Sequence, residues 1–381
     1  MAETPGVLLD DEQRLAWLRL SRSENVGPVL FYQLINRYGS ATEALEALPE
    51  LALRGGRKRP PRIYPRERAE KDMQAAARLG ARFVARGEAG YPVWLRHIDG
   101  PPPLLCVKGR LELAESPMLA MVGSRNASAA GLTLARRLAA EVGQAGYVIV
   151  SGLARGIDTA AHEAALERGT VAVLAGGIDH VYPKENAALM AQIGEKGLLI
   201  TEMTPGTVPR AEFFPRRNRL VSGMALGVVV VEAAMRSGSL ITARFAAEQG
   251  REVMAVPGSP LDPRAAGTLK LLREGATLVT SGRDILEAIA PLASRPLPDA
   301  RPLRDTPVPE GGHAAAPPEE EPSGDLRQRV LSLLGPGETE LDDLIREAGA
   351  PPGLVIATIM ELELAGLVHQ PLPGRIARLS A

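Results

Sequence analysis

The sequence predicts an α/β protein with a doubly wound parallel sheet, flanked by an N-terminal helical domain and a C-terminal winged-helix domain. Three observations lead to this fold class. Short apolar segments alternate with helical patterns over residues 118–279. Glycine-rich turns follow most of these apolar segments. A Pro-rich stretch then separates this region from a C-terminal pattern of three helices and a hairpin.

The alternation is clearest between residues 118 and 162. An apolar strand at Met118–Val122 runs into the turn Gly123-Ser124-Arg125 and a helix. A second strand, Tyr147–Val150, runs into another Gly-containing turn and a helix that starts near Asp158. Two short strands separated by a helix indicate a βαβ unit with parallel strands. The glycines then lie at the carboxyl ends of the strands, where open α/β sheets bind ligands.

The same pattern continues along the chain and predicts an extended Rossmann-like sheet. An entry strand at Leu104–Val107 precedes it. The remaining expected strands are Val171–Leu174, Leu198–Thr201, Val228–Val231, Glu252–Val256 and Ala276–Val279. The expected helices are Ser128–Val142, Asp158–Glu167, Asn186–Ile193, Thr242–Gln249 and Thr268–Arg273.

The N-terminal segment, residues 10–87, has apolar residues at helical spacing throughout. The turn Asn25-Val26-Gly27-Pro28 between two helices is typical of helix-hairpin-helix DNA modules. It is equally typical of any small helical bundle, and the bundle is the favoured interpretation. The basic, Pro-containing run Leu53–Arg68 could contact phosphates, but a solvated loop is favoured.

The C-terminal third begins with residues 291–324, which contain nine prolines and predict an extended or disordered linker. Three helices and an apolar hairpin then predict a winged helix. Its third helix, Leu354–Ala365, has two Glu and no Lys or Arg, which disfavours base reading and favours a protein-contact or structural role. The predicted domain boundaries are therefore 1–88 (helical), 89–290 (Rossmann-like), 291–324 (linker) and 325–381 (winged helix).

Composition restricts the class of protein. The single cysteine, Cys106, excludes an internal disulfide and fits a reducing compartment. Neither a signal peptide nor an apolar run of membrane-spanning length is visible, so we expect a soluble cytoplasmic protein without membrane insertion. The net charge of −1 conceals a surplus of +5 over residues 1–290, which by itself does not predict nucleic-acid binding.

The strand-end loops combine small residues with cations. Small residues let backbone N–H groups approach a ligand, and helix N-termini behind them favour anions. Arg125 follows the first strand, Lys184 lies after the third, and the segment FFPRRNRL, expected to be a loop, supplies Arg216, Arg217 and Arg219. This combination predicts a row of phosphate contacts instead of one pyrophosphate site. Aromatic residues beside the cations could stack on unpaired bases.

Evidence for catalysis is weak. Asp158 and His162, one helical turn apart, could form an acid/base couple, but a helix cap and a packed histidine are favoured. Neither metal-ligand spacing, nor a G-x-x-x-x-G-K-[ST] loop, nor a G-x-G-x-x-G turn after the first strand is present. We therefore expect no catalytic residues, metal or cofactor. Glu202 and Glu232 could act in catalysis or form ion pairs with Arg217 and Arg219.

Distinctive motifs extend over roughly residues 91–285. They are YPVWL, PPPLLCVKG, MVGSRNAS, IVSGLARGIDTAAHEAAL, VLAGGIDHVYPKEN, LITEM, FFPRRNRLVSG, VVVEAAMRSGSLITARFAAEQG, VMAVPG and LLREGATLV. In these motifs and in their order, the chain resembles the DNA-processing protein A (DprA, also called Smf) family of bacterial natural transformation.

The resemblance implies a non-enzymatic protein that binds single-stranded DNA, protects incoming strands and loads the RecA recombinase. It also implies a homodimer formed through the Rossmann-like domain, loosely around Thr268–Leu278, and a sterile-alpha-motif-like N-terminal domain. The DNA-binding residues carried over by position, together with the glycines of the third strand end, are Gly123, Ser124, Arg125, Gly152, Gly176, Gly177, Lys184, Asn186, Phe214, Arg217, Asn218 and Arg219.

This function has two alternatives. The first is a nucleotide-processing enzyme of the lysine-decarboxylase-like (nucleoside monophosphate phosphoribohydrolase) type. Such enzymes carry a P-G-G-x-G-T loop, whereas this chain has Arg236-Ser237-Gly238-Ser239-Leu240 and a separate Pro257-Gly258. The second is a scaffold for protein partners, which would bind no oligonucleotide at low salt.

Overall fold

The computed structural model describes residues 9–294, 322–335, 337–372 and 374–379. The chain divides into two compact units. Of the described residues, 9–71, 99–104 and those from 322 onward form the terminal unit, and 72–98 and 105–294 form the sheet unit. Most of the linker predicted at 291–324 lies outside the described residues. Across the described part of the chain, no helix is both long and apolar enough to cross a bilayer.

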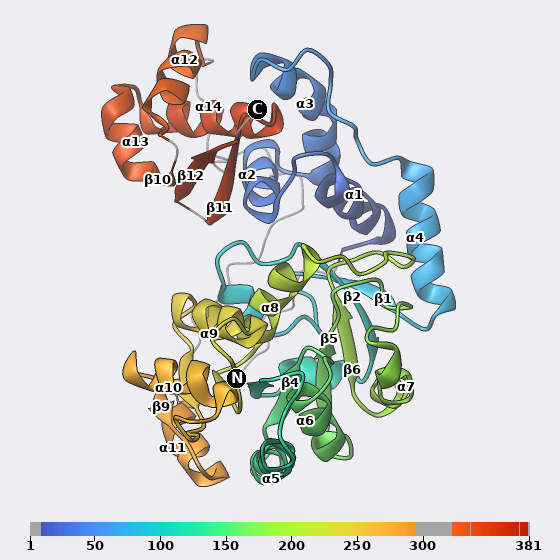
Figure 1. The fold of residues 1–381 in the computed structure, drawn as a ribbon. Coiled ribbons are helices and arrows are strands. Elements are labelled where there is room, and N and C mark those ends of the chain that lie inside the picture. Colours follow the sequence, from blue (N-terminus) through green and yellow to red (C-terminus); the bar gives the residue numbers. More distant parts are fainter. Residues whose placement is uncertain (1–8, 295–321, 336, 373, 380–381) are drawn as a thin grey trace. The chain divides into compact units, whose positions relative to one another are not determined.

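The sheet unit is built on a nine-stranded sheet with the order β1-β2-β6-β5-β4-β3-β7-β8-β9 among the described residues (Figure 1). Neighbouring strands from β6 to β9 in this order pair in parallel, while β2 pairs antiparallel with β6. The strands are β1 (Arg82–Ala85), β2 (Leu104–Gly109), β3 (Met118–Val122), β4 (Val148–Ser151), β5 (Thr170–Val173), β6 (Leu198–Thr201), β7 (Gly227–Val230), β8 (Glu252–Ala255) and β9 (Thr277–Leu278). The predicted doubly wound sheet is confirmed.

Helices cover both faces of this sheet. On one face, α5, α6 and α11 pack their apolar sides against strand residues such as Leu119, Ile149 and Val229. On the other face, α8 and α9 pack against Ala120, Val150 and Val228. Strand residues alternate between the two clusters, as the period of two requires. The helices of this region are α4 (Arg66–Arg78), α5 (Ala129–Gln144), α6 (Ile157–Ala165), α7 (Ala187–Lys196), α8 (Phe213–Met224), α9 (Gly238–Glu248), α10 (Ala266–Arg273) and α11 (Gly282–Ala293).

The terminal unit joins the two ends of the described chain. Its N-terminal helices are α1 (Asp11–Arg22), α2 (Pro28–Tyr38) and α3 (Ala41–Arg54). Asp10 starts α1 with a capping box to Gln13, and Trp17 packs edge-on against Phe31 with ring centroids 5.0 Å apart. Its C-terminal part contains α12 (Gly324–Leu333), β10 (Thr339–Glu340), α13 (Leu341–Ala348), α14 (Pro352–Leu364), β11 (Val368–Leu372) and β12 (Arg375–Arg378). The winged-helix pattern is confirmed.

Two predictions about local structure were wrong. Residues 82–85 form strand β1, although the segment 10–87, apart from the loop at 53–68, was expected to be helical. The segment FFPRRNRL is not a loop but the start of α8. Pro215 is tolerated there because it lies in the first turn, where backbone N–H groups have no partner within the helix.

Candidate nucleic-acid interface

The carboxyl ends of six strands meet at one edge of the sheet. Strands β3 to β8 run in the same direction, so the turns that follow them lie along a single edge. The chain reverses its direction of winding between the neighbours β3 and β7, which makes the gap beyond their ends the topological switch point. This geometry confirms that the small-residue turns and the cations near them share one edge.

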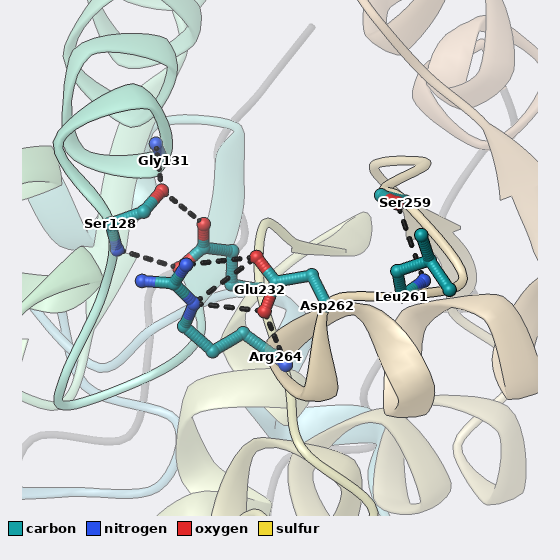
Figure 2. A network of polar contacts seen from close by, with 7 residues as sticks. All are labelled: Ser128, Gly131, Glu232, Ser259, Leu261, Asp262 and Arg264. Carbon is teal, nitrogen blue, oxygen red and sulfur yellow. Dashed lines mark hydrogen bonds and ion pairs between the residues drawn. The ribbon is translucent and has the colours of Figure 1, made fainter.

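The switch point itself is filled by a carboxylate of the protein (Figure 2). Glu232, which follows β7, accepts hydrogen bonds from the backbone N–H of Ser128 at 3.0 Å and from its hydroxyl at 2.5 Å. A Cβ on Gly131 would lie 2.6 Å from the Glu232 carboxyl, so glycine is needed for this approach. The carboxylate therefore occupies the N-terminus of α5, the position at which a dinucleotide site would hold its pyrophosphate. The ion pair left open between Glu232 and Arg217 or Arg219 is not formed among the described residues.

The Gly-containing turn after β4 also faces inward. The N–H groups of Gly152 and Ala154 donate to the Asp158 carboxylate at 3.1 and 3.3 Å. Asp158 is 6% exposed, and burial raises its pKa while the nearby Arg217 opposes that shift. These two backbone donors are thus already used within the protein.

Arg217 is the buried cation that balances this carboxylate. Its guanidinium donates to the carbonyl oxygens of Gly152 and Val173, and its side chain is nearly inaccessible. A Cβ on Gly152 would collide with this guanidinium, which explains the glycine. Burial lowers the pKa of Arg217 to about 10, and Asp158 opposes the shift. Arg217 therefore ties the ends of β4 and β5 together from inside.

His162 is packed beneath this turn. Its Nδ1 lies 2.7 Å from the hydroxyl of Thr170, which itself donates to the Ile149 carbonyl at 2.8 Å. The hydroxyl therefore accepts from His162, and the unprotonated Nε2 has no hydrogen-bond partner among the residues that the structure describes. Burial lowers the pKa of His162 to about 3. These contacts bear out the packed histidine. The expected helix cap was wrong: Gly156 is the N-cap of α6, without a side-chain cap hydrogen bond, and Asp158 accepts from the turn that precedes the helix.

The exposed part of the edge carries a different group of side chains, which we call the outer rim: Arg125, Tyr182, Lys184 and Phe214. The rings of Tyr182 and Phe214 lie 5.3 Å apart, and the Arg125 guanidinium lies 5.6 Å from the Phe214 ring centroid. Arg125 and Lys184 are exposed, and neither forms an ion pair with another described residue. Tyr182 is 48% exposed. The outer rim thus presents cations and aromatic rings together.

The remaining predicted residues shape the edge. Asn186 is buried and donates to the Leu153 carbonyl at 2.9 Å, which links the turns after β4 and β5. Gly123 packs against Ile157, and Gly176 and Gly177 pack against the segment 204–209. Ser124 and Asn218 are half-exposed, and Asn218 donates to the Gly238 carbonyl at 3.3 Å. Arg219 forms an ion pair with Glu202, as one of the alternatives for Glu202 predicted.

Sequence reasoning missed two residues at this edge. Tyr182 was not selected, although it stands two positions before Lys184 in a chain with few aromatic residues. Arg155 is exposed and pairs with Glu185 at 3.6 Å, in the turn selected for its glycines. Arg155 stands between Gly152 and Gly156 in the sequence, and this place in a turn already selected was a usable signal. In the described segments, no cluster of three metal-ligating side chains occurs.

The fold and the edge define a Rossmann-like protein with cations and aromatic rings at the carboxyl edge, and with its cofactor position closed by Glu232. The family model for DNA recombination-mediator protein A matches residues 82–290. Two further models match the flanks: a DprA-like N-terminal HHH domain at 11–75 and a DprA winged-helix domain at 314–375. The HHH model covers the helical domain for which the resemblance implied a sterile-alpha-motif-like arrangement.

Individual relatives agree with the family models. Protein Smf of Escherichia coli is 38% identical over 83% of this chain and 82% of its own, and DNA processing protein DprA of Bacillus subtilis is 45% identical over 60% and 77%. The X-ray structure of DprA from Streptococcus pneumoniae is 36% identical, with a TM-score of 0.60 over 76% of this chain and 100% of its own. A structure of DNA processing protein A from Helicobacter pylori, described for its single-stranded DNA binding mode, is 27% identical, with a TM-score of 0.51 over 56% and 95%. The chain belongs to the DprA/Smf family of DNA recombination-mediator proteins.

Proposed function

We propose that this protein binds single-stranded DNA along the carboxyl edge of its sheet, without catalysing a reaction. The observation that carries this proposal is the outer rim, where the exposed Arg125 lies over the Phe214 ring, Phe214 packs against Tyr182, and the exposed Lys184 stands two residues after Tyr182. Arginine and lysine bind phosphates, and aromatic rings stack on bases that are not paired. The single-stranded DNA binding described for the Helicobacter pylori relative supports the same ligand.

Within this proposal the predicted residues divide by burial. Arg125, Lys184 and Phe214, together with Tyr182, contact the strand directly. Ser124, Asn218 and Arg219 are half-exposed and contribute polar contacts beside them. The buried or packed residues hold the turns in the shape that brings the direct contacts together: Gly123, Gly152, Gly176, Gly177, Asn186 and Arg217.

The geometry gives the enzyme alternative little support. Asp158 and His162 are buried and bonded to other groups, so they do not form an accessible acid/base couple. Glu232 is bonded to Ser128 at the position where a nucleotide phosphate would sit. Release of free base from a nucleoside monophosphate by the pure protein would reverse this ranking.

The test is a titration of fluorescent single-stranded and double-stranded oligonucleotides at several salt concentrations. The Arg125→Ala, Lys184→Ala double variant should bind single strands more weakly by about 1–3 kcal/mol per lost charge-assisted contact. The slope of log affinity against log salt should become shallower by about 1.4, since each single-strand phosphate contact contributes about 0.7. Unchanged affinity and slope would remove the outer rim as the binding site.

The matched control is the Arg168→Ala, Lys196→Ala double variant. It removes the same two residue types, but Arg168 follows α6 and Lys196 ends α7, so both lie at the opposite, amino edge of the sheet. Both side chains are exposed. This control should bind like the parent protein, so a loss shared by both variants would indicate only a general charge effect.

Family membership supports three finer roles. The protein protects incoming strands, which nuclease digestion of bound and free oligonucleotides would test. It loads the RecA recombinase, which the rate of recombinase assembly on single strands would test. It forms a homodimer near Thr268–Leu278, where Leu278 is 54% exposed at the edge of the sheet. A monomer-to-dimer transition that Leu278→Glu abolishes in analytical ultracentrifugation would support the last role.

A further inference from the structure

The third helix of the winged helix, α14, is buried on two sides. In DNA-reading proteins of this type, the corresponding helix presents one side to the major groove. Here Val355, Ile359 and Leu362 belong to the core of the winged helix itself. A second stripe, Ala357, Met360 and Leu364, lies outside that core and is only 2%, 3% and 0% exposed. Another part of the terminal unit therefore covers the second stripe.

The close approach of α3 identifies the covering element. Gly55, directly after α3, has a helical φ of −66°, so its backbone would accept any residue. A Cβ at this position would nevertheless collide with the Glu361 carbonyl oxygen of α14 and approach the Ala365 Cβ to 3.0 Å. Glycine thus lets the end of α3 touch the backbone of α14.

Polar contacts fasten the same surfaces. The side chain of Asn25 donates to the Leu364 carbonyl at 3.1 Å, and Arg57 donates to the same oxygen at 3.5 Å. This carbonyl is at the C-terminus of α14, where a cation is favourable. Gln370 of β11 donates to the side chain of Gln33 of α2 at 3.5 Å.

Charge complementarity supports this contact over DNA. Helix α14 has two Glu and no Lys or Arg, which is unfavourable beside phosphates. Glu361 is fully buried and pairs with Arg327 at 2.8 Å, while Arg37 and Arg54 of the N-terminal helices act on it electrostatically. The buried Glu361 of α14 therefore lies within electrostatic range of two arginines of the N-terminal helices.

We propose that the winged helix is a docking domain, and that the second stripe of α14 binds the N-terminal helical domain of its own chain. The two ends of the protein then form one unit through α14, α3 and the turn at Asn25. In this arrangement the helix that reads DNA in related folds makes a protein contact, and DNA binding is left to the sheet edge.

A thiol placed on the second stripe can test this in the full-length chain. Ala357→Cys is a small change at a 2% exposed position, and the one natural cysteine, Cys106, is buried. In the native chain, the reaction of this thiol with a maleimide should be at least about tenfold slower than after denaturation, because it requires opening. Reaction at the denatured rate would overturn the proposal.

Two further substitutions should then expose the thiol. Gly55→Leu places a side chain against Glu361, and Asn25→Asp replaces an amide donor by a carboxylate facing the Leu364 carbonyl while keeping a residue type that tolerates φ of 62°. Each should accelerate labelling by about tenfold or more. Gly27→Ala is the matched control, since its φ is −82° and no atom of the described segments lies within 4 Å of the added Cβ. It should label like the parent.

Two other outcomes of these labelling experiments would overturn the proposal. If neither Gly55→Leu nor Asn25→Asp changes the labelling rate, another surface covers α14 and the proposal fails. Protection that disappears on dilution would assign the covering domain to a second copy and overturn docking within one chain. Single-strand binding is measured in parallel, so loss of docking and loss of the DNA site are distinguished.

Discussion

The inner and outer parts of the same sheet edge use similar residues for opposite purposes. Arg217 inside and Arg125 outside both lie within 6 Å of the Phe214 ring, at 5.9 and 5.6 Å. The Arg217 guanidinium is hydrogen-bonded to two carbonyl groups, and Asp158 compensates its charge, whereas Arg125 is exposed. A buried cation with its donors used holds the protein together, and an exposed cation can exchange solvent for a phosphate. Burial, not residue type, separates the two roles.

The largest expected effect follows from breaking the inner part. Arg217→Ala leaves the buried Asp158 carboxylate without its compensating charge, so the free energy of unfolding of the sheet unit should fall by about 3–5 kcal/mol. Chemical denaturation followed by circular dichroism would measure this. Arg216→Ala, an exposed neighbour on the same helix, should stay within about 0.5 kcal/mol of the parent. Equal effects of the two variants on the free energy of unfolding would contradict the division of the sheet edge into a structural inner part and an exposed outer part.

A change in the outer rim should affect binding and leave stability intact. Tyr182→Ala removes the exposed partner of Phe214, and loss of one stacked base should weaken single-strand binding by about 1–3 kcal/mol. Fluorescence anisotropy would measure the affinity, and denaturation should show an unchanged midpoint. Tyr182→Phe keeps the ring and should retain the affinity. A loss of stability without a loss of affinity would assign Tyr182 to the inner part.

The buried histidine predicts a pH dependence of stability. The pKa of His162 is lowered to about 3 in the folded protein. As the pH falls, the His162 imidazole is therefore protonated at a higher pH in the unfolded chain than in the folded chain. The contribution of the neutral His162 to the free energy of unfolding is complete above pH 6.5. It decreases towards pH 3, by up to about 1.4 kcal/mol per pH unit. His162→Asn, which can still donate to Thr170, should flatten this slope between pH 7 and 5. Parallel slopes for the variant and the parent protein would refute the assignment.

The smallest effect is expected at the switch point. Glu232→Gln keeps an acceptor for Ser128 but removes the negative charge at the N-terminus of α5, which should cost about 0.3–1 kcal/mol of stability. Thermal unfolding of the two proteins side by side would measure it. Single-strand affinity should remain that of the parent, because Glu232 lies outside the outer rim. A gain or loss of tenfold in affinity would show that the DNA path crosses the switch point.

Most of the sheet could be predicted from sequence because each central strand is a short apolar run between turn residues. The expected strand at 118–122 has the observed bounds, and the one at 147–150 is shifted by a single residue. Helix α8 was missed because Pro215 and a cluster of arginines are typical of loops, and only its position in the first turn makes the proline compatible with a helix. Strand β1 was missed because it is four residues long and follows a helix.

The sequence by itself determined the doubly wound sheet, the common edge of its Gly-containing turns and the residue types along that edge. Apolar periodicity and strand-to-turn order are local properties, so they are visible without coordinates. Only the tertiary structure decided that Arg217 and Asp158 are buried, that Glu232 closes the switch point and that Tyr182 joins the outer rim. It also decided that α14 faces α3. These properties depend on which segments, distant in the sequence, meet in the fold. The free energy of a charged or aromatic side chain depends on the groups that surround it there.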